Sequence, residues 1–228
     1  MEYDVVVVGG GPSGLATAIK FAQLNKQNGT DYSICLLEKG SEIGAHILSG
    51  NVFQPNALDE LIPNWKELNA PLNVPVTKDK IYYLLKDIGI PVPPFVMPNL
   101  NNHGNYVISL GNLCRWLGEQ AENLGVEVFP GFPASKLIFE NDEVVGVQTG
   151  DMGVSESGEL KPGHELGIEI KAKMTILGEG CRGHLGKQII NKYNLSDGKD
   201  PQHYGIGFKE VWKLKPENHN EGLVIHTN

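Results

Sequence analysis

The stretch that decides the fold is EYDVVVVGGGPSG, residues 2–14. Its first part, Glu2–Val8, is a short apolar run rich in β-branched valines, which predicts a strand buried on both faces of a parallel sheet. Apolar residues recur at helical spacing over Gly14–Leu24, and a second apolar run, Ser33–Glu38, predicts another strand. The chain therefore opens with a strand, a glycine loop, a helix and a second strand.

The glycine loop has the pattern G-x-G-x-x-G at residues 9–14. In such a loop Gly9 permits the tight turn, Gly11 lets the main chain approach a pyrophosphate, and Gly14 lets the helix pack closely on the strand. The pattern alone is a weak signal. Its position between a predicted strand and a predicted helix makes it a dinucleotide-binding motif.

The residues around the loop extend the predicted nucleotide site. Pro12 and Ser13 open the helix, whose N-terminal amides would face the phosphates along a favourable dipole. The second strand ends in Glu38, 24 residues after Gly14, close to the interval expected of an acid that accepts hydrogen bonds from an adenosine ribose. Its negative charge disfavours a ribose 2′-phosphate. Lys39 follows directly, and we predict that these residues contact the cofactor.

The rest of the chain favours FAD over NAD as that dinucleotide. A triple glycine at the start of the chain, with Glu-Lys after the second strand, is typical of flavoproteins of the glutathione-reductase type. The chain then leaves the sheet for a long, proline-rich stretch, residues 40–105, and returns through a helix predicted over Leu110–Leu124. We predict an α/β fold: an FAD-binding Rossmann-like domain of the glutathione-reductase type with a β-meander and an irregular proline-rich insertion.

The C-terminal half supplies the remaining predicted elements. A short strand is predicted over Val126–Phe129 and a hairpin over Ala134–Gly150, whose turn is Asn-Asp. Met152–Gly163 is predicted to be a glycine-rich loop. Ile168–Leu177 is predicted to form two strand-like pieces, and Leu185–Tyr193 a helix.

Composition excludes several classes of function. A net charge of −8 and a pI near 5.4 argue against nucleic-acid binding, which normally shows a basic patch. The three cysteines, Cys35, Cys114 and Cys181, lie far apart without metal-ligand spacing, so we expect reduced thiols and no metal site. No apolar run approaches the roughly 18 residues that span a bilayer, so we expect any membrane contact to be peripheral.

Several longer strings carry a family resemblance. Together they resemble the electron transfer flavoprotein–ubiquinone oxidoreductases, from Met1 to about His226; the strings are GAHILSG at 44–50, APLNVPVT at 70–77, NNHGNYVISLGNLCRWLGEQAENLGVEVFPG at 101–131, ILGEGCRGHLGKQ at 176–188 and YGIGFKEVW at 204–212. The resemblance is far more specific than the glycine motif.

The resemblance implies a function. The family carries electrons from reduced electron transfer flavoprotein to ubiquinone at a membrane surface, as an electron-transferring-flavoprotein dehydrogenase with one FAD and one four-iron four-sulfur cluster. It implies a peripheral protein of the cytoplasmic face of a bacterial inner membrane, or of the matrix side of the mitochondrial inner membrane. We expect no catalytic side chain, because the flavin carries the redox chemistry and the protein supplies orientation and electrostatics.

The resemblance also implies contacts with the cofactor beyond the glycine loop. The string at 44–50 would lie along the flavin, and it ends in Ser49 and Gly50. The residues 177–183 themselves predict a strand end and a glycine-rich turn that would face the cofactor with Glu179 and Gly180. There Glu179 would bond a ribityl or ribose hydroxyl, and Arg182 would lie near phosphate. The turn has an alternative interpretation, in which its charges face solvent.

The family's chain is more than twice this length, and its cluster is held by four cysteines near the C-terminus. The three cysteines here match none of them, so we expect the cluster only in a C-terminal part and interpret the chain as an N-terminal fragment. The expected organisation is a first FAD-binding part at 1–60, an insertion that shapes the quinone and membrane side at 61–105, a second FAD-binding part at 106–190, and the start of a quinone-binding domain at 191–228.

Some alternatives stay open. The apolar segment Ile90–Pro98 either seats the protein at a membrane interface or folds as an ordinary loop over the core. The chain is alternatively a flavin-dependent reductase or hydroxylase of the geranylgeranyl-reductase type, or a non-catalytic FAD-binding remnant. Oxidation of NAD(P)H would identify the reductase, and flavin that no donor reduces would identify the remnant.

Overall fold

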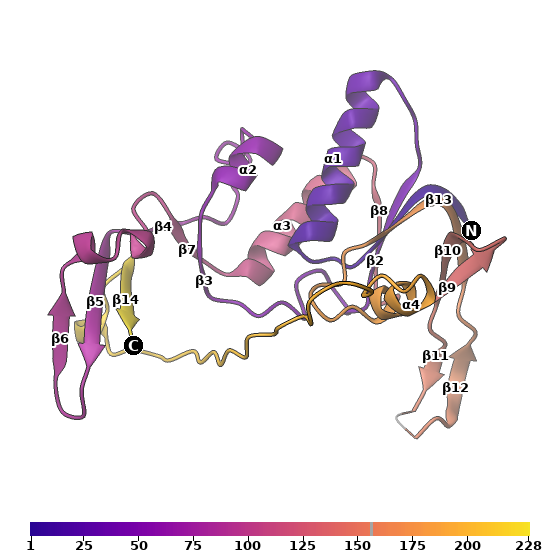
Figure 1. Cartoon of the computed structure of the whole chain (residues 1–228). Helices are drawn as coiled ribbons and strands as arrows, with labels where there is room; N and C mark the ends of the chain where they lie inside the picture. Colours follow the sequence, from indigo (N-terminus) through magenta and orange to yellow (C-terminus); the bar gives the residue numbers. More distant parts are fainter. Residues whose placement is uncertain (156) are drawn as a thin grey trace. The chain divides into compact units, whose positions relative to one another are not determined.

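The computed structural model describes residues 1–155 and 157–228, and the chain divides into two compact units (Figure 1). Unit 1 comprises Met1–Ile47 and Cys114–Gly205, and unit 2 comprises Leu48–Leu113 and Ile206–Asn228. Each unit is therefore built from two separate stretches of sequence.

Unit 1 contains a six-stranded sheet in the order β8-β2-β1-β13-β10-β9. Strand β1 pairs in parallel with β2 and β13, and β2 with β8, whereas β10 is antiparallel to both β13 and β9. The strands are β1 (Glu2–Val8), β2 (Ile34–Glu38), β8 (Glu127–Pro130), β9 (Ala134–Glu140), β10 (Glu143–Thr149) and β13 (Glu169–Leu177). This mixed sheet with a parallel centre confirms the predicted α/β class.

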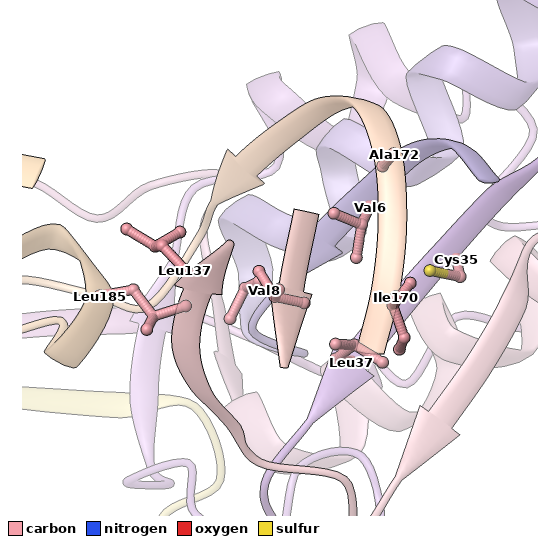
Figure 2. Packing of buried hydrophobic residues seen from close by; sticks show 9 residues of the cluster. Val6, Val8, Cys35, Leu37, Leu137, Ile170, Ala172 and Leu185 are labelled. Atoms are coloured by element: carbon pink, nitrogen blue, oxygen red, sulfur yellow. The ribbon is translucent and has the colours of Figure 1, made fainter. Parts of the chain in front are cut away.

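The centre of the sheet is buried on both faces. Val6, Val8 and Leu37 lie in one apolar cluster with Leu137 and with Leu185 of the helix that covers this face (Figure 2). The residues that alternate with them along β1 and β2 point to the opposite face, because successive side chains of a strand point to opposite faces. Those residues are also buried, namely Val5, Val7, Ile34 and Leu36.

Three helices accompany the sheet: α1 (Pro12–Asn28), α3 (Leu110–Asn123) and α4 (His184–Lys192) (Figure 1). Helix α1 begins directly after the glycine loop and buries one stripe, Leu15, Ala18, Ile19 and Ala22. It ends at Gly29, whose φ of 64° is the left-handed conformation that closes many helices. The predicted helix and both flanking strands are confirmed, with α1 extending four residues beyond Leu24 to Asn28.

Two predicted segments of unit 1 are corrected. Residues 152–163, predicted as a loop, contain β11 (Met152–Val154) and most of β12 (Leu160–Glu165), which pair antiparallel. The ribbon is largely exposed, so its sequence lacks the apolar alternation that marks a half-buried strand. The segment predicted as two pieces forms one strand, β13 (Glu169–Leu177), because its first residues pair with β10 and the rest with β1.

Unit 2 contains two small sheets, in the orders β14-β5-β6 and β3-β7-β4. The residues predicted to be irregular, 40–105, therefore hold several short elements. They are β3 (Asn51–Phe53), α2 (Asn56–Leu61), β4 (Val74–Pro75), β5 (Lys78–Leu84), β6 (Gly89–Val92) and the short 3₁₀ turns η1 (Pro94–Val96) and η2 (Pro98–Leu100); β7 (Tyr106–Ile108), η3 (Pro216–Asn218) and β14 (Leu223–Thr227) follow.

Proline positions in unit 2 follow the hydrogen bonding of its strands. Pro91 lies in β6, an edge strand, where a missing N–H does not interrupt the ladder between two neighbours. The central strand of that sheet, β5, contains no proline and pairs in parallel with β14. Trp65 is buried in this unit; its ring packs edge-on against Tyr106, and its indole N–H donates to Asp59.

Candidate functional site: a nucleotide cavity in unit 1

A cavity of about 820 Å³ opens in unit 1 where β1, β2 and β13 end. In open α/β sheets, ligands bind at the carboxyl ends of the parallel strands. Its lining comes from five stretches, namely Val8–Ser13, Leu37–Lys39, residues 44 and 46–47, Pro133–Ser135, and residues 178–180 with 182–184.

The glycine loop is shaped by close backbone contacts. Gly9 has φ +110°, and a β-carbon there would lie 2.4 Å from the carbonyl oxygen of Gly178. A β-carbon on Gly14 would lie 1.9 Å from the carbonyl oxygen of Gly9. At Gly11 the nearest atom to such a carbon is Ile47 Cδ1, at 3.9 Å. Gly9 and Gly14 are therefore required by the packing of the protein itself, whereas Gly11 borders open space.

Glu38 lines the cavity and holds the loop by hydrogen bonds. Its Oε2 accepts the N–H of Gly10 at 2.7 Å, and its Oε1 accepts the N–H of Gly40 at 2.6 Å. The negative charge also reaches the buried thiol of Cys114. Burial first, and then the charge of Glu38, raises the pKa of that thiol to about 11, so it stays protonated near neutral pH.

Glu179 lines the same cavity but bonds to helix α4. Its Oε1 accepts the N–H groups of His184 and Leu185 at 2.9 and 3.1 Å, and its Oε2 accepts that of Gly186 at 2.9 Å. These are amides of the first helical turn, which have no partner within a helix. In this structure the Glu179 carboxylate therefore caps α4, and neighbouring Gly180, with φ +80°, turns the chain at the cavity wall.

The predicted residues fall into three groups. Gly9, Gly11, Pro12, Ser13, Glu38, Lys39, Glu179 and Gly180 line the cavity. Gly14 does not line the cavity but packs against the backbone of Gly9 and so supports the loop. Ser49 and Gly50 lie in unit 2, where Ser49 Oγ is 2.5 Å from Ser109 Oγ and the carbonyl of Gly50 accepts from Lys209 Nζ.

Sequence reasoning missed part of the lining. Pro133, Ala134 and Ser135 come from the turn into β9 and carry no recognised motif. His184 follows the glycine-rich turn and was also missed. Arg182, which the sequence placed near a phosphate, does line the cavity and lies over the ring of Tyr204 at 5.2 Å. The position of His184 shortly after the end of β13 is the one signal that could have indicated it.

Among residues 1–155 and 157–228, no group of three or more His, Cys, Asp or Glu side chains is arranged to hold a metal ion. Within the same residues, no helix has both the length and the apolar character needed to cross a bilayer.

Comparison with solved structures defines the class. The chain superposes on a geranylgeranyl bacteriochlorophyll reductase-like protein from Thermoplasma acidophilum with a TM-score of 0.55, at 23% identity, over 82% of this chain and 41% of that one. It superposes on the FAD-dependent chondrochloren halogenase CndH with a TM-score of 0.56, at 17% identity, over 82% and 39%. A family model described as NAD(P)-binding Rossmann-like domain matches residues 7–66. The fold is thus the Rossmann-like α/β fold of flavin-dependent enzymes.

Curated relatives that match the chain along its length carry one name. The chain is 56% identical to the electron transfer flavoprotein–ubiquinone oxidoreductase of Pseudomonas aeruginosa, over 100% of this chain and 42% of that protein. It is 48% identical to the human mitochondrial protein of the same name, over 99% and 37%. The resemblance seen in the sequence is confirmed: along its whole length the chain is a homologue of these oxidoreductases, and it spans about two fifths of their length.

Proposed function

We propose that this chain is the FAD-binding portion of an electron transfer flavoprotein–ubiquinone oxidoreductase, an electron-transferring-flavoprotein dehydrogenase. One observation carries the proposal. The glycine loop and Glu38 meet in one cavity at the carboxyl ends of β1, β2 and β13, in a chain 56% identical to a protein of that name. Neither the fold nor the identity alone specifies the cofactor, but the two agree on a flavin dinucleotide.

The cavity fits such a cofactor. Its volume of about 820 Å³ lies within the range of roughly 300–1,000 Å³ that is usual for ligand sites. The loop leaves space beside Gly11 and places the start of α1 at the wall, where helix amides and the helix dipole favour phosphate. The carboxylate of Glu38 offers acceptors to ribose hydroxyls, and Lys39 beside it offers a positive charge.

The residues of the chain bind and orient, and we assign none of them a catalytic role. The main chain of residues 9–14 would hold the diphosphate, Glu38 the ribose, and Gly180 would let the chain pass close to the cofactor. Ser49 and Gly50 would contribute small side chains and amides near the flavin. Glu179 would act by fixing the turn through its bonds to α4. FAD, when bound, supplies the transfer of electrons between donor and acceptor.

The proposal extends to the activity of the whole protein. Reduced electron transfer flavoprotein would be the donor and ubiquinone the acceptor, and a four-iron four-sulfur cluster would belong to residues beyond those that this chain spans. A membrane surface would be the place of reaction, bacterial cytoplasmic or mitochondrial matrix. Exposed apolar side chains in unit 2 support such contact, among them Ile88, Phe95 and Val96, which are 60%, 82% and 55% exposed.

Binding of FAD is the first test. Purified protein should bind FAD in a titration followed by flavin fluorescence, and Gly11→Ala should weaken binding by about tenfold or more without lowering the melting temperature. A β-carbon at Gly11 has room in the protein but occupies the approach of the phosphates. Protein that binds no FAD would contradict the proposal.

Reduction of the bound flavin is the second test. Reduced electron transfer flavoprotein from Pseudomonas aeruginosa should bleach the flavin absorption faster than NADH or NADPH at the same concentration. Preferential bleaching by NAD(P)H would favour the reductase alternative, and flavin that none of these donors reduces would favour a non-catalytic remnant.

A further inference from the structure

The Glu38 carboxylate makes two hydrogen bonds within the protein at the place where a ribose is expected. It accepts the N–H of Gly10, in the glycine loop, and the N–H of Gly40, two residues further along its own turn. The distances of 2.7 and 2.6 Å are those of charge-assisted hydrogen bonds. One carboxylate thus connects the end of β2 to the loop that follows β1.

The turn that carries Glu38 is itself fixed to its neighbours. The carbonyl oxygen of Glu38 accepts the N–H of Phe132 at 2.9 Å, and that of Gly40 accepts the N–H of Gly131 at 2.7 Å. Both bonds anchor the turn to the chain just after β8. The carboxylate therefore extends from a rigid frame, and it transmits that rigidity to Gly10.

Space around Gly10 is tight as well. A β-carbon there would lie 2.6 Å from Ile43 Cδ1 and 2.9 Å from Glu38 Oε2. Any side chain at this position would therefore press on Ile43 and on the carboxylate that accepts the Gly10 N–H. The amides that would face a diphosphate follow directly in sequence, at the start of α1.

The internal bonds leave acceptor capacity for a ligand. A carboxylate offers about four lone-pair sites, and the two internal bonds occupy about half of them. Glu38 can therefore hold the loop and accept ribose hydroxyls at the same time.

We propose that Glu38 is a positioning residue that holds the glycine loop in its diphosphate-binding conformation before any nucleotide arrives. The inference rests on the proposed function and adds to it a second role for a residue whose expected role is ribose binding. It has a distinctive consequence: loss of the carboxylate weakens binding even of a nucleotide that has no ribose hydroxyl for it to contact.

A pair of ligands separates the two roles. ADP carries the 2′- and 3′-hydroxyls, and 2′,3′-dideoxy-ADP lacks both while keeping the adenine and the diphosphate. Glu38→Gln has nearly the same size but turns one acceptor into a donor, so one of the two N–H groups loses its partner whichever way the amide is oriented. The control is Glu42→Gln, which removes the same charge from an exposed residue that does not line the cavity.

In calorimetric titrations of the nucleotide-free protein, Glu38→Gln should lower the affinity for ADP and for 2′,3′-dideoxy-ADP by about tenfold each. Glu42→Gln should bind both nucleotides as the unsubstituted protein does. Amide exchange without nucleotide should also accelerate at Gly10 in Glu38→Gln, because its N–H loses a strong acceptor. If Glu38→Gln weakens ADP but leaves 2′,3′-dideoxy-ADP unaffected, Glu38 is a ribose ligand only and the inference is overturned alone. Unsubstituted protein that binds neither nucleotide overturns the proposed function and this inference with it.

Discussion

Strands β1 of unit 1 and β5 of unit 2 are both seven residues long and both have a parallel neighbour, yet they are specified differently. In β1, Val5–Val8 are all at most 6% exposed. In β5 the one buried hydrophobic residue is Ile81, while Tyr83 and Leu84 are 52% and 46% exposed. Burial on two faces leaves a continuous apolar run in the sequence, whereas a strand held mainly by pairing and one buried side chain leaves almost no pattern.

The difference also separates the expected roles of the units. Unit 1 buries the apolar side chains of its central strands and brings polar main chain to a cavity, as a nucleotide site requires. Unit 2 leaves large apolar side chains exposed along β6 and η1. A soluble surface rarely gathers many such side chains, and clusters of them mark contact with a partner or a membrane.

The substitution expected to destabilise unit 1 most is Gly14→Ala. The new β-carbon would lie 1.9 Å from the Gly9 carbonyl oxygen, and because that atom belongs to the backbone it cannot move aside easily. We expect a loss of about 4 kcal/mol in the free energy of unfolding, the size reserved for severe steric effects. Urea denaturation followed by circular dichroism measures it.

Gly11→Ala is the matched control for that change. Its φ of −82° suits alanine and its β-carbon has room, so stability should change by less than about 0.5 kcal/mol. Equal destabilisation by both substitutions would contradict the close packing of α1 against β1.

The sequence predicted most of unit 1 because its signals are local. The valine run, the glycines and the apolar stripe of α1 are each visible within one element, so β1 and α1 were identified correctly. Glu38 was found by its interval from Gly14, since the length of α1 and its loops fixes where β2 ends.

What the sequence did not predict depends on pairing and proximity between distant residues. The hairpin β11–β12 buries little and carries no alternation. The pairing of β14 with β5 joins residues almost 150 positions apart, for example Thr227 and Tyr82. In the cavity, Ser135 and His184 lie close together because α4, which begins at His184, contacts β9. No spacing rule in the sequence indicates this contact.

The difference in burial between the two units can be tested by truncating one apolar side chain in a strand of each. Leu36→Ala removes a fully buried side chain from β2 and should cost about 3 kcal/mol of unfolding free energy, including the cavity it leaves. Ile90→Ala removes the same number of carbons from β6, but Ile90 is 45% exposed, so we expect less than about 1 kcal/mol. Chemical denaturation measures both, and similar costs would show that β6 is buried in solution.

A third experiment addresses the exposed apolar surface of unit 2. If it enters a membrane interface, replacing Val96 and Met97 together by aspartate should reduce the fraction bound to phospholipid liposomes by about tenfold or more, because a charged group resists transfer from water. Both residues are about half exposed, at 55% and 44%, so folding should be retained. Flotation of liposomes through a density gradient measures binding.

The control for this experiment adds the same two charges to unit 1. Leu166 and Leu195 are exposed to a similar or greater degree, 75% and 53%, and their replacement by aspartate should leave liposome binding unchanged. Unchanged binding by the Val96 and Met97 variant would contradict a membrane role for this surface and favour an ordinary surface loop.

The smallest expected effect concerns the attachment of β14 in unit 2. The carboxylate of Asp79, in β5, accepts the main-chain and side-chain N–H groups of Asn102 at 2.9 and 2.8 Å, and it lies 3.5 Å from His226 Nε2 of β14. Burial opposes the charge, but the hydrogen bonds from Asn102 and the contact with His226 outweigh it and hold the pKa of Asp79 below its ordinary value of 3.8. Asp79→Asn should lower the stability of β14 by about 1 kcal/mol at neutral pH.

The pH dependence distinguishes this charge effect from a loss of packing. A carboxyl whose pKa is lowered on folding stabilises the folded state above its unfolded pKa, and the contribution disappears as the pH falls through the folded pKa. The difference between Asp79→Asn and the unsubstituted protein, measured by amide exchange in Leu223–Thr227, should therefore be present at about pH 5 and shrink below pH 3.8. Asp87→Asn, in the exposed turn between β5 and β6, should show no difference at either pH. If the difference for Asp79→Asn persists undiminished below the folded pKa, the effect comes from packing and not from the charge of Asp79.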